Sequence, residues 1–71
     1  MAESTMLVNG TEFSLGELSA PEPLALIEHF QLDPRSVAVE RNGQIVPRSE
    51  WPGLRLADEE RIELIRFVGG G

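Results

Sequence analysis

The chain has 71 residues, which is enough for one small domain. It contains no cysteine, and this excludes a disulfide framework, a cysteine zinc site and a cysteine nucleophile. Twelve acidic residues oppose six arginines, and the net charge of −6 makes nucleic acids and anionic membranes poor partners. We find no signal-peptide pattern and no apolar run of the ~20 residues that a membrane span needs, so we expect a cytoplasmic protein.

The N-terminal part of the chain predicts a β-hairpin. Residues 1–5 are expected to form a disordered extension, because most of them are small or polar. Residues 6–8 form a short apolar run, and residues 11–15 alternate polar and apolar side chains. Asn9-Gly10 between them is a dipeptide typical of two-residue hairpin turns, because both turn positions need a positive φ.

One helical pattern follows, over residues 23–31. Pro23 suits the first helical turn, where the N–H that it lacks would be unpaired. At 100° per residue, the polar Glu28 and His29 fall on one half of the helical wheel. The other half is apolar and contains Leu24, Leu26, Ile27 and Phe30. So short a helix needs tertiary contacts to be stable. We expect it to bury Ile27 and Phe30 against Val8, Val39, Ile62 and Leu64.

The C-terminal half contains three further strand patterns. Residues 37–41 and residues 44–46 flank a second hairpin dipeptide, Asn42-Gly43. Pro47 ends the shorter of these two strands. The last pattern, over residues 62–68, is the most regular of the three, with apolar and charged side chains in alternation.

The segment before the last strand is expected to be irregular. It covers residues 48–56, with a brief strand pairing at 55–56 and with Trp51 as a structural plug at its centre. Residues 57–60 end in three successive acidic side chains and are expected to form a solvated turn.

The order of these elements is β-β-α-β-β-β, which predicts the α+β class. A helical crossover after a hairpin usually returns the chain parallel to an existing strand. One face of the sheet must then carry the core. We therefore expect a β-grasp, or ubiquitin-like, domain over residues 6–68, with a mixed sheet of four or five strands and one helix on one face. Residues 69–71 follow it as a flexible glycine tail.

The sequence offers no catalytic constellation. His29 lies on the polar half of the helix, and we expect a solvated surface histidine. The neighbouring carboxylates of Asp58, Glu59 and Glu60 are better explained by a solvated turn than by acid–base catalysis, because no apolar pocket is expected there to raise a pKa. We therefore expect a protein that is not an enzyme and that binds neither a metal nor a cofactor.

The C-terminal glycines are the most informative feature. Gly69, Gly70 and Gly71 directly follow the last strand. A tail without side chains can pass through a narrow channel and present its terminal carboxylate to an active site on another protein. On composition alone, a frayed terminus explains the three glycines equally well.

Four residues near this tail are candidates for docking a partner. If Ile62 and Leu64 face the helix, Ile65 and Phe67 stand on the open face of the sheet. They could form a docking patch or a small second cluster beneath residues 48–56. Two arginines, Arg66 beside the tail and Arg48, could contact an acidic partner surface. For Arg48, hydrogen bonds to nearby loop carbonyls are the alternative.

Three stretches of the sequence resemble the sulfur carrier family of thiamine biosynthesis, the ThiS type. They are Asn9-Gly10, the segment Asn42-Gly43-Gln44-Ile45-Val46-Pro47-Arg48-Ser49-Glu50-Trp51, and the end Phe67-Val68-Gly69-Gly70-Gly71. The glycine end is shared by all ubiquitin-like carriers. The Val-Pro-Arg step followed by Trp is the specific part, and the resemblance covers the chain from residue 6 onward.

The resemblance implies a carrier with three partners. An E1-like adenylyltransferase (ThiF type) would use ATP and magnesium to adenylate the carboxylate of Gly71. A sulfur donor fed by a cysteine desulfurase would convert the adenylate to a thiocarboxylate, and thiazole synthase (ThiG type) would take up the sulfur. Two alternatives stay open. One is a sulfur carrier of another pathway, either the small subunit of molybdopterin synthase or a carrier for cysteine synthesis, and the other is a ligand-sensing or RNA-binding β-grasp module.

Overall fold

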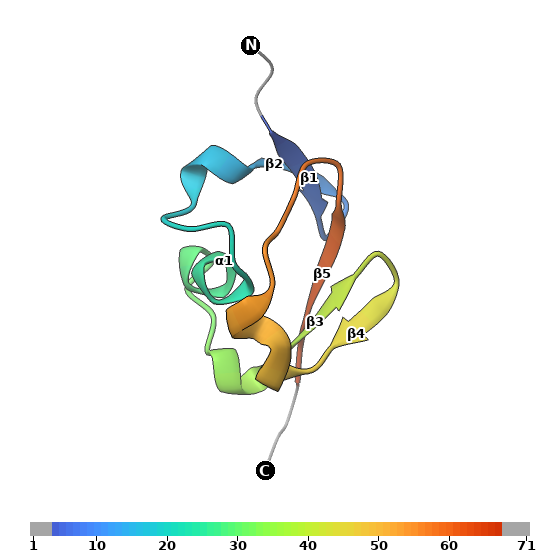
Figure 1. The fold of residues 1–71 in the computed structure, drawn as a ribbon. Helices are drawn as coiled ribbons and strands as arrows, with labels where there is room; N and C mark the ends of the chain where they lie inside the picture. The colour runs from blue at the N-terminus through green and yellow to red at the C-terminus, as the bar shows by residue number, and fades with distance from the viewer. Residues whose placement is uncertain (1–3, 68–71) are drawn as a thin grey trace.

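A computed structural model describes residues 4–67 of the chain and has the predicted β-grasp architecture. A five-stranded mixed sheet carries the helix α1 on one face (Figure 1). This confirms the α+β class, the element order and the ubiquitin-like arrangement. The bounds are Thr5–Val8 (β1), Thr11–Ser14 (β2), Pro23–His29 (α1), Val37–Arg41 (β3), Gln44–Val46 (β4) and Arg61–Arg66 (β5).

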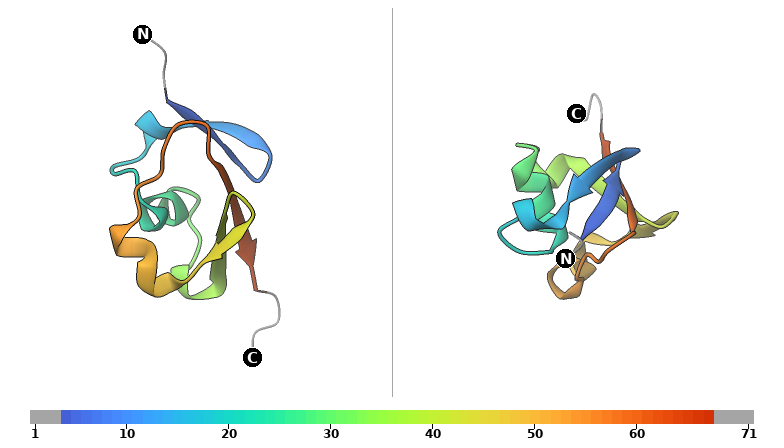
Figure 2. Two further views of the ribbon diagram at one scale, coloured as in Figure 1. Left: turned by 45° about the vertical axis from the view of Figure 1, so that its right-hand side comes forward. Right: turned by 90° about the horizontal axis from the view of Figure 1, so that it is seen from above.

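The strand order is β2-β1-β5-β3-β4, so the last strand of the chain lies in the middle of the sheet. β5 runs parallel to β1 and antiparallel to β3. The two hairpins form the opposite edges of the sheet (Figure 2). Both predicted turns are present, because Asn9 and Gly10 have φ values of 51° and 82°, and Asn42 and Gly43 have 51° and 88°.

The hydrophobic core lies between α1 and the sheet. Ile27 is 0% exposed and belongs to one buried cluster with all four predicted strand partners. The prediction is therefore confirmed for Ile27. The buried apolar residues of the cluster are Met6, Val8, Leu26, Ile27, Val37, Val39, Trp51, Leu56, Ile62 and Leu64.

The prediction for Phe30 is wrong, because this side chain is 42% exposed. α1 ends at His29, two residues before the predicted end. Gln31 adopts a left-handed φ of 59°. The N–H of Leu32 then donates to the carbonyl of Ile27 at 3.1 Å, and that of Gln31 to Glu28 at 2.9 Å. These two bonds form a Schellman motif, which ends the helix directly after Phe30. The N–H of Phe30 still donates to Leu26 at 3.3 Å, and its ring packs against Phe13 and His29 at the surface.

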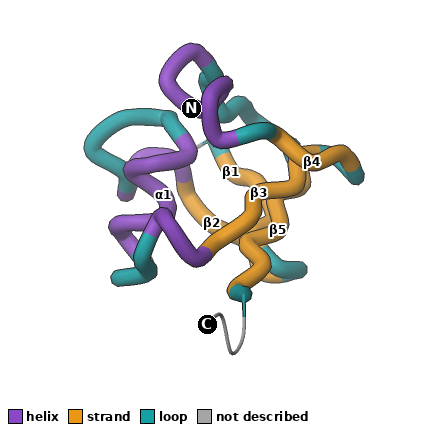
Figure 3. The backbone as a smooth tube through the Cα atoms, turned by 90° about the horizontal axis from the view of Figure 1, so that it is seen from below, coloured by secondary structure: helices purple, strands orange, loops and turns teal. Residues whose placement is uncertain are grey.

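Three short 3-10 helices complete the described fold. They are Leu15–Glu17 (η1), Pro34–Ser36 (η2) and Arg48–Gly53 (η3). In Figure 3 the helical segments, in purple, lie to one side of the strands. The predicted second strand is shorter by one residue, because Leu15 begins η1.

The segment before β5 is more ordered than expected. Trp51 in η3 is buried and donates its Nε1–H to the carbonyl of Val46 at 3.1 Å, which confirms its role as a structural plug. The expected strand pairing at residues 55–56 does not form. Leu56 is instead buried, and its N–H donates to the carbonyl of Pro21 at 2.8 Å.

Two further expectations need correction. Thr5 does not belong to a disordered extension, because it pairs with Ser14 in the first hairpin and its N–H donates to Asp58 Oδ1 at 2.9 Å. Glu60 is not solvated. Its side chain is buried, and its carboxylate accepts hydrogen bonds from the N–H of Ala57 at 2.9 Å and from Arg41 Nε at 2.6 Å.

Candidate functional site

Successive side chains of β5 lie on opposite faces of the sheet. Ile62 and Leu64 are buried beneath α1, whereas Ile65 and Phe67 are 39% and 59% exposed on the opposite face. The orientation predicted from the alternation is therefore confirmed. The role of these residues in docking a partner stays a prediction.

The open face gains a third large apolar side chain from β4. Ala38 pairs with Ile65, and Glu40 pairs with Ile45, so these four side chains share one face of the sheet. Ile45 is 58% exposed. We call Ile45, Ile65 and Phe67 the open-face patch. The sequence alone does not place Ile45 on this face, because its position follows only from the register of β4, β3 and β5.

The alternative of a second cluster beneath residues 48–56 is wrong. Trp51 and Leu56, the two buried residues of that segment, pack into the core on the α1 side of the sheet. They leave Ile65 and Phe67 uncovered. An exposed group of large apolar side chains on so small a domain is typical of an interaction surface.

The charges of the open face divide it in two. Glu40 and Glu63 are paired in the register of β3 and β5, at the start of β5. Arg61, which precedes them, is exposed. The apolar side chains Ile65 and Phe67 follow at the other end of β5. The face therefore suits a partner with an apolar centre and basic groups on one flank.

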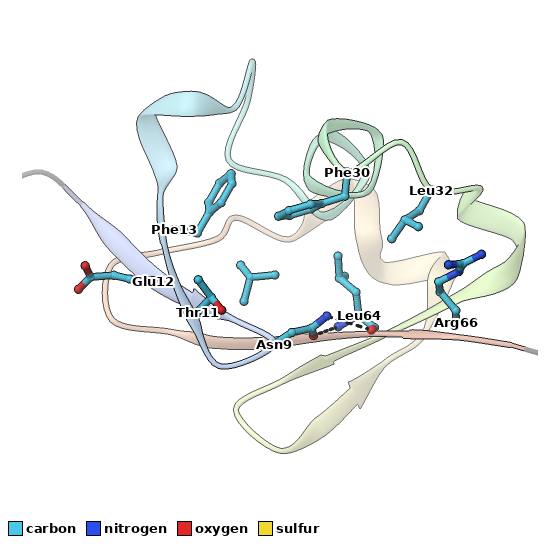
Figure 4. A pocket seen from close by; sticks show the side chains of 9 residues that line it. Asn9, Thr11, Glu12, Phe13, Phe30, Leu32, Leu64 and Arg66 are labelled. Carbon is cyan, nitrogen blue, oxygen red and sulfur yellow. Dashed lines mark hydrogen bonds between the residues drawn. The ribbon is translucent and has the colours of Figure 1, made fainter.

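The structure does not bring Arg66 together with the open-face patch. Its side chain lies on the same side of β5 as Leu64, near Leu32 (Figure 4). This follows from the alternation of the strand, in which Arg66 has the opposite orientation to Ile65 and Phe67.

Arg48 makes the hydrogen bond to a loop carbonyl that was one of its two predicted roles. One guanidinium nitrogen donates to the carbonyl of Pro34 at 3.3 Å, and the side chain stays exposed. Nearby, Arg35 hydrogen-bonds to Asp33 and lowers the pKa of that carboxyl below its ordinary value, with a smaller contribution from the charge of Arg48.

Phe67 is the last described residue and is fixed to the fold by its backbone. Its N–H donates to the carbonyl of Ser36 at 2.9 Å. The predicted bounds of the last strand are wrong, because β5 begins at Arg61, one residue earlier than predicted, and ends at Arg66. Val68 and the tail residues Gly69, Gly70 and Gly71 lie outside the described residues. The described chain therefore ends within the open-face patch, because Phe67 belongs to it.

Two negative findings concern the described part of the chain. Within residues 4–67, no group of three or more His, Asp or Glu side chains could hold a metal ion. No helix in this range is long and apolar enough to cross a membrane.

Comparisons with known proteins found one family model and similar stretches in two kinds of protein. The model of the ThiS family matches residues 6–71. The chain is 39% identical over 46 residues to the sulfur carrier protein ThiS of Bacillus subtilis, and this match covers 65% of the chain and 70% of that protein. It is 36% identical over 66 residues to a thiazole synthase of Paramagnetospirillum magneticum. That match covers 93% of the chain but only 20% of the thiazole synthase, so the chain spans about a fifth of that relative's length.

A solved structure has the same fold. The crystal structure of a thiamine biosynthesis protein (ThiS) from Geobacter metallireducens superposes with a TM-score of 0.77. The match covers 94% of this chain and 99% of that chain, at 24% sequence identity.

Proposed function

Because the chain belongs to the ThiS family, we propose that it is a sulfur carrier of thiamine biosynthesis and that its reactive group is the carboxylate of Gly71. The observation that carries this proposal is the extent of the family match, which runs through the three C-terminal glycines to residue 71. In the sequence, the first of these glycines follows Phe67 of the open-face patch by two residues.

The chemistry requires activation of a poor electrophile. The α-carboxylate is ionised at pH 7, because its pKa is roughly 3.5. In the active site of an E1-like adenylyltransferase (ThiF type), this carboxylate attacks the α-phosphorus of ATP in the presence of magnesium. An acyl-adenylate forms and pyrophosphate leaves. The terminal sulfur of a persulfide on a cysteine-desulfurase-derived donor then attacks the acyl carbon, and the bond to AMP breaks. A thiol reduces the resulting acyl disulfide, so that Gly71 becomes a thiocarboxylate and the thiol and the donor sulfur form a disulfide. In this scheme the partner enzymes supply the catalytic groups.

We infer that thiazole synthase (ThiG type) is the acceptor of the sulfur. A relative named thiazole synthase contains a stretch of 66 residues similar to this chain, which supports a working connection between the two kinds of protein. The open-face patch of Ile45, Ile65 and Phe67 is the proposed docking surface for the enzymes that receive the tail. Arg48 lies beside Leu24 and Trp51, and Arg66 lies on the other face of β5, so any contact that these arginines make with a partner is outside the patch.

The test is the intact mass of the protein after incubation with ATP, magnesium, the adenylyltransferase and a sulfur source. Replacement of one oxygen by sulfur raises the mass by about 16 Da. The reaction without ATP is the control.

Deletion of Gly71 should abolish the increase in mass, although Gly70 then carries a carboxylate, because the chain is shorter by up to ~3.6 Å. Unimpaired sulfur loading of this deletion variant would refute the carrier assignment.

A further inference from the structure

A second surface feature lies on the opposite side of the sheet from the open-face patch. It is a groove of about 500 Å³ between the β1–β2 hairpin, the end of α1 and β5 (Figure 4). Its walls are mainly apolar and include Phe13, Phe30, Leu32 and Leu64. We call it the helix-side groove. Phe30 lies tilted against Phe13 at a centroid distance of 5.5 Å and stays 42% exposed at the wall of this groove.

The hydrogen bonds of β5 show which peptide groups face this groove. The carbonyl of Arg61 accepts from Asn42 N–H at 2.7 Å, and the N–H of Phe67 donates to Ser36 at 2.9 Å, both on the β3 side. The carbonyl of Ile62 accepts from Asn9 N–H at 2.9 Å on the β1 side. Because peptide groups alternate along a strand, the N–H and C=O of Arg66 also point to the β1 side.

No strand of the described structure pairs with Arg66 on that side. The register between β1 and β5 ends at Val8 and Ile62, because β1 turns away at Asn9. The side-chain amide of Asn9 then takes the place of one further rung, since its Oδ1 accepts from the N–H of Leu64 at 2.8 Å. Beyond this rung β5 has an open edge at Arg66, and an open strand edge is a template for an added strand.

One end of the groove carries a positive charge. Arg66 has no ion-pair partner within residues 4–67, and its guanidinium stands at the β5 end of the groove. The carboxylate of Glu12 on β2 points away from the groove, because Glu12 has the opposite orientation to Phe13. A ligand with a carboxylate at the Arg66 end and apolar groups against the two phenylalanines would therefore be complementary to the groove.

From these observations we propose that the helix-side groove binds an extended, acidic peptide segment of a partner protein. The segment adds a short strand to β5 at Arg66, places apolar side chains on Phe13, Phe30 and Leu32, and pairs a carboxylate with the Arg66 guanidinium. The groove and the open-face patch lie on opposite faces of the sheet, so both can be occupied at once. The proposal goes beyond sulfur transfer and does not depend on it.

Two capped peptides test the proposal on the full chain. One is acetyl-Gly-Leu-Ser-Leu-Ser-Asp-Gly-amide, and the other has the reverse order, because the added strand can run in either direction. Either peptide should shift the NMR amide signals of Leu64, Arg66 and Leu32, and should slow the hydrogen exchange of the Arg66 amide. The absence of binding by both peptides at about 5 mM would overturn the proposal, as would shifts confined to Ile65 and Phe67.

A charge exchange separates this site from non-specific binding. Arg66→Glu should weaken binding of the aspartate peptide by ~10-fold or more, and a lysine in place of the aspartate should restore it. Arg61→Glu is the matched control, because it changes the same charge on the same strand but on the other face, and it should leave the affinity unchanged. Deletion of Gly71 should also have no effect, which separates this result from the carrier test. Equal affinity of both peptides for the parent and for Arg66→Glu would overturn the proposal.

Discussion

Replacement of Ile27 by alanine tests how the helix is anchored to the sheet. Ile27 is 0% exposed and lies within the single buried cluster. The substitution removes three carbon atoms, which corresponds to about 2.4 kcal/mol of lost burial at ~0.8 kcal/mol for each carbon. The residual cavity adds to this loss, so we expect roughly 2–5 kcal/mol. A domain of this size has only about 3–5 kcal/mol of stability in total, so the variant should be close to unfolding.

The assay is thermal and urea unfolding followed by circular dichroism. A loss of 1 kcal/mol lowers the Tm of so small a domain by about 4–8 °C. Leu24→Ala is the matched control, because it lies on the same helix but is 43% exposed, and it should cost less than about 1 kcal/mol. If Ile27→Ala does not fold, Ile27→Val should still cost about 0.5–1.5 kcal/mol. A parent-like Tm for Ile27→Ala, or equal losses for both alanine variants, would refute the proposed packing.

Two further predictions concern the open face and the buried carboxylate. Phe67→Ala should weaken binding to the adenylyltransferase by roughly 2 kcal/mol, as expected for an aromatic contact residue. The Tm should be unchanged, because Phe67 is 59% exposed. Unfolding of the variant, or an unchanged affinity in calorimetry, would contradict the docking role. Glu60→Ala should cost about 1–3 kcal/mol in urea unfolding, because Arg41 and the N–H of Ala57 lose their acceptor. Glu59→Ala, in the same turn but exposed, should cost under about 0.5 kcal/mol, and equal effects of the two would count against the buried pair.

The parts of the fold that the sequence predicted depend on local chemistry. Asn9-Gly10 and Asn42-Gly43 predict their turns because few other dipeptides tolerate a positive φ at both positions. The alternation along β5 likewise separates Leu64 from Ile65, because a strand has a period of two residues. These two signals predict the two hairpins and the exposure of Ile65 and Phe67.

The incorrect predictions depend on contacts between distant residues or on an unusual local choice. The Schellman motif places Gln31, not glycine, at the left-handed position, so the sequence gives no sign that α1 ends there. Glu60 stands in an acidic run, and its partner Arg41 comes near only when β3 pairs with β5. Ile45 joins the open-face patch for the same reason. Arg66 is different, because the alternation of β5 already places it away from Phe67.

The last prediction separates the shape of the tail from the identity of its terminal residue. Gly70→Val retains Gly71 and the full chain length. It adds a β-branched side chain next to the reactive carboxylate, and this both stiffens the backbone and widens the tail. If the tail passes through a narrow channel in the adenylyltransferase, a displacement of ~1 Å can lower the rate about 10²-fold, so the gain of about 16 Da should be lost or strongly delayed. The Tm is measured in parallel and should match that of the parent. Normal loading of Gly70→Val, together with failed loading of the Gly71 deletion, would refute the narrow channel but leave the carrier function intact.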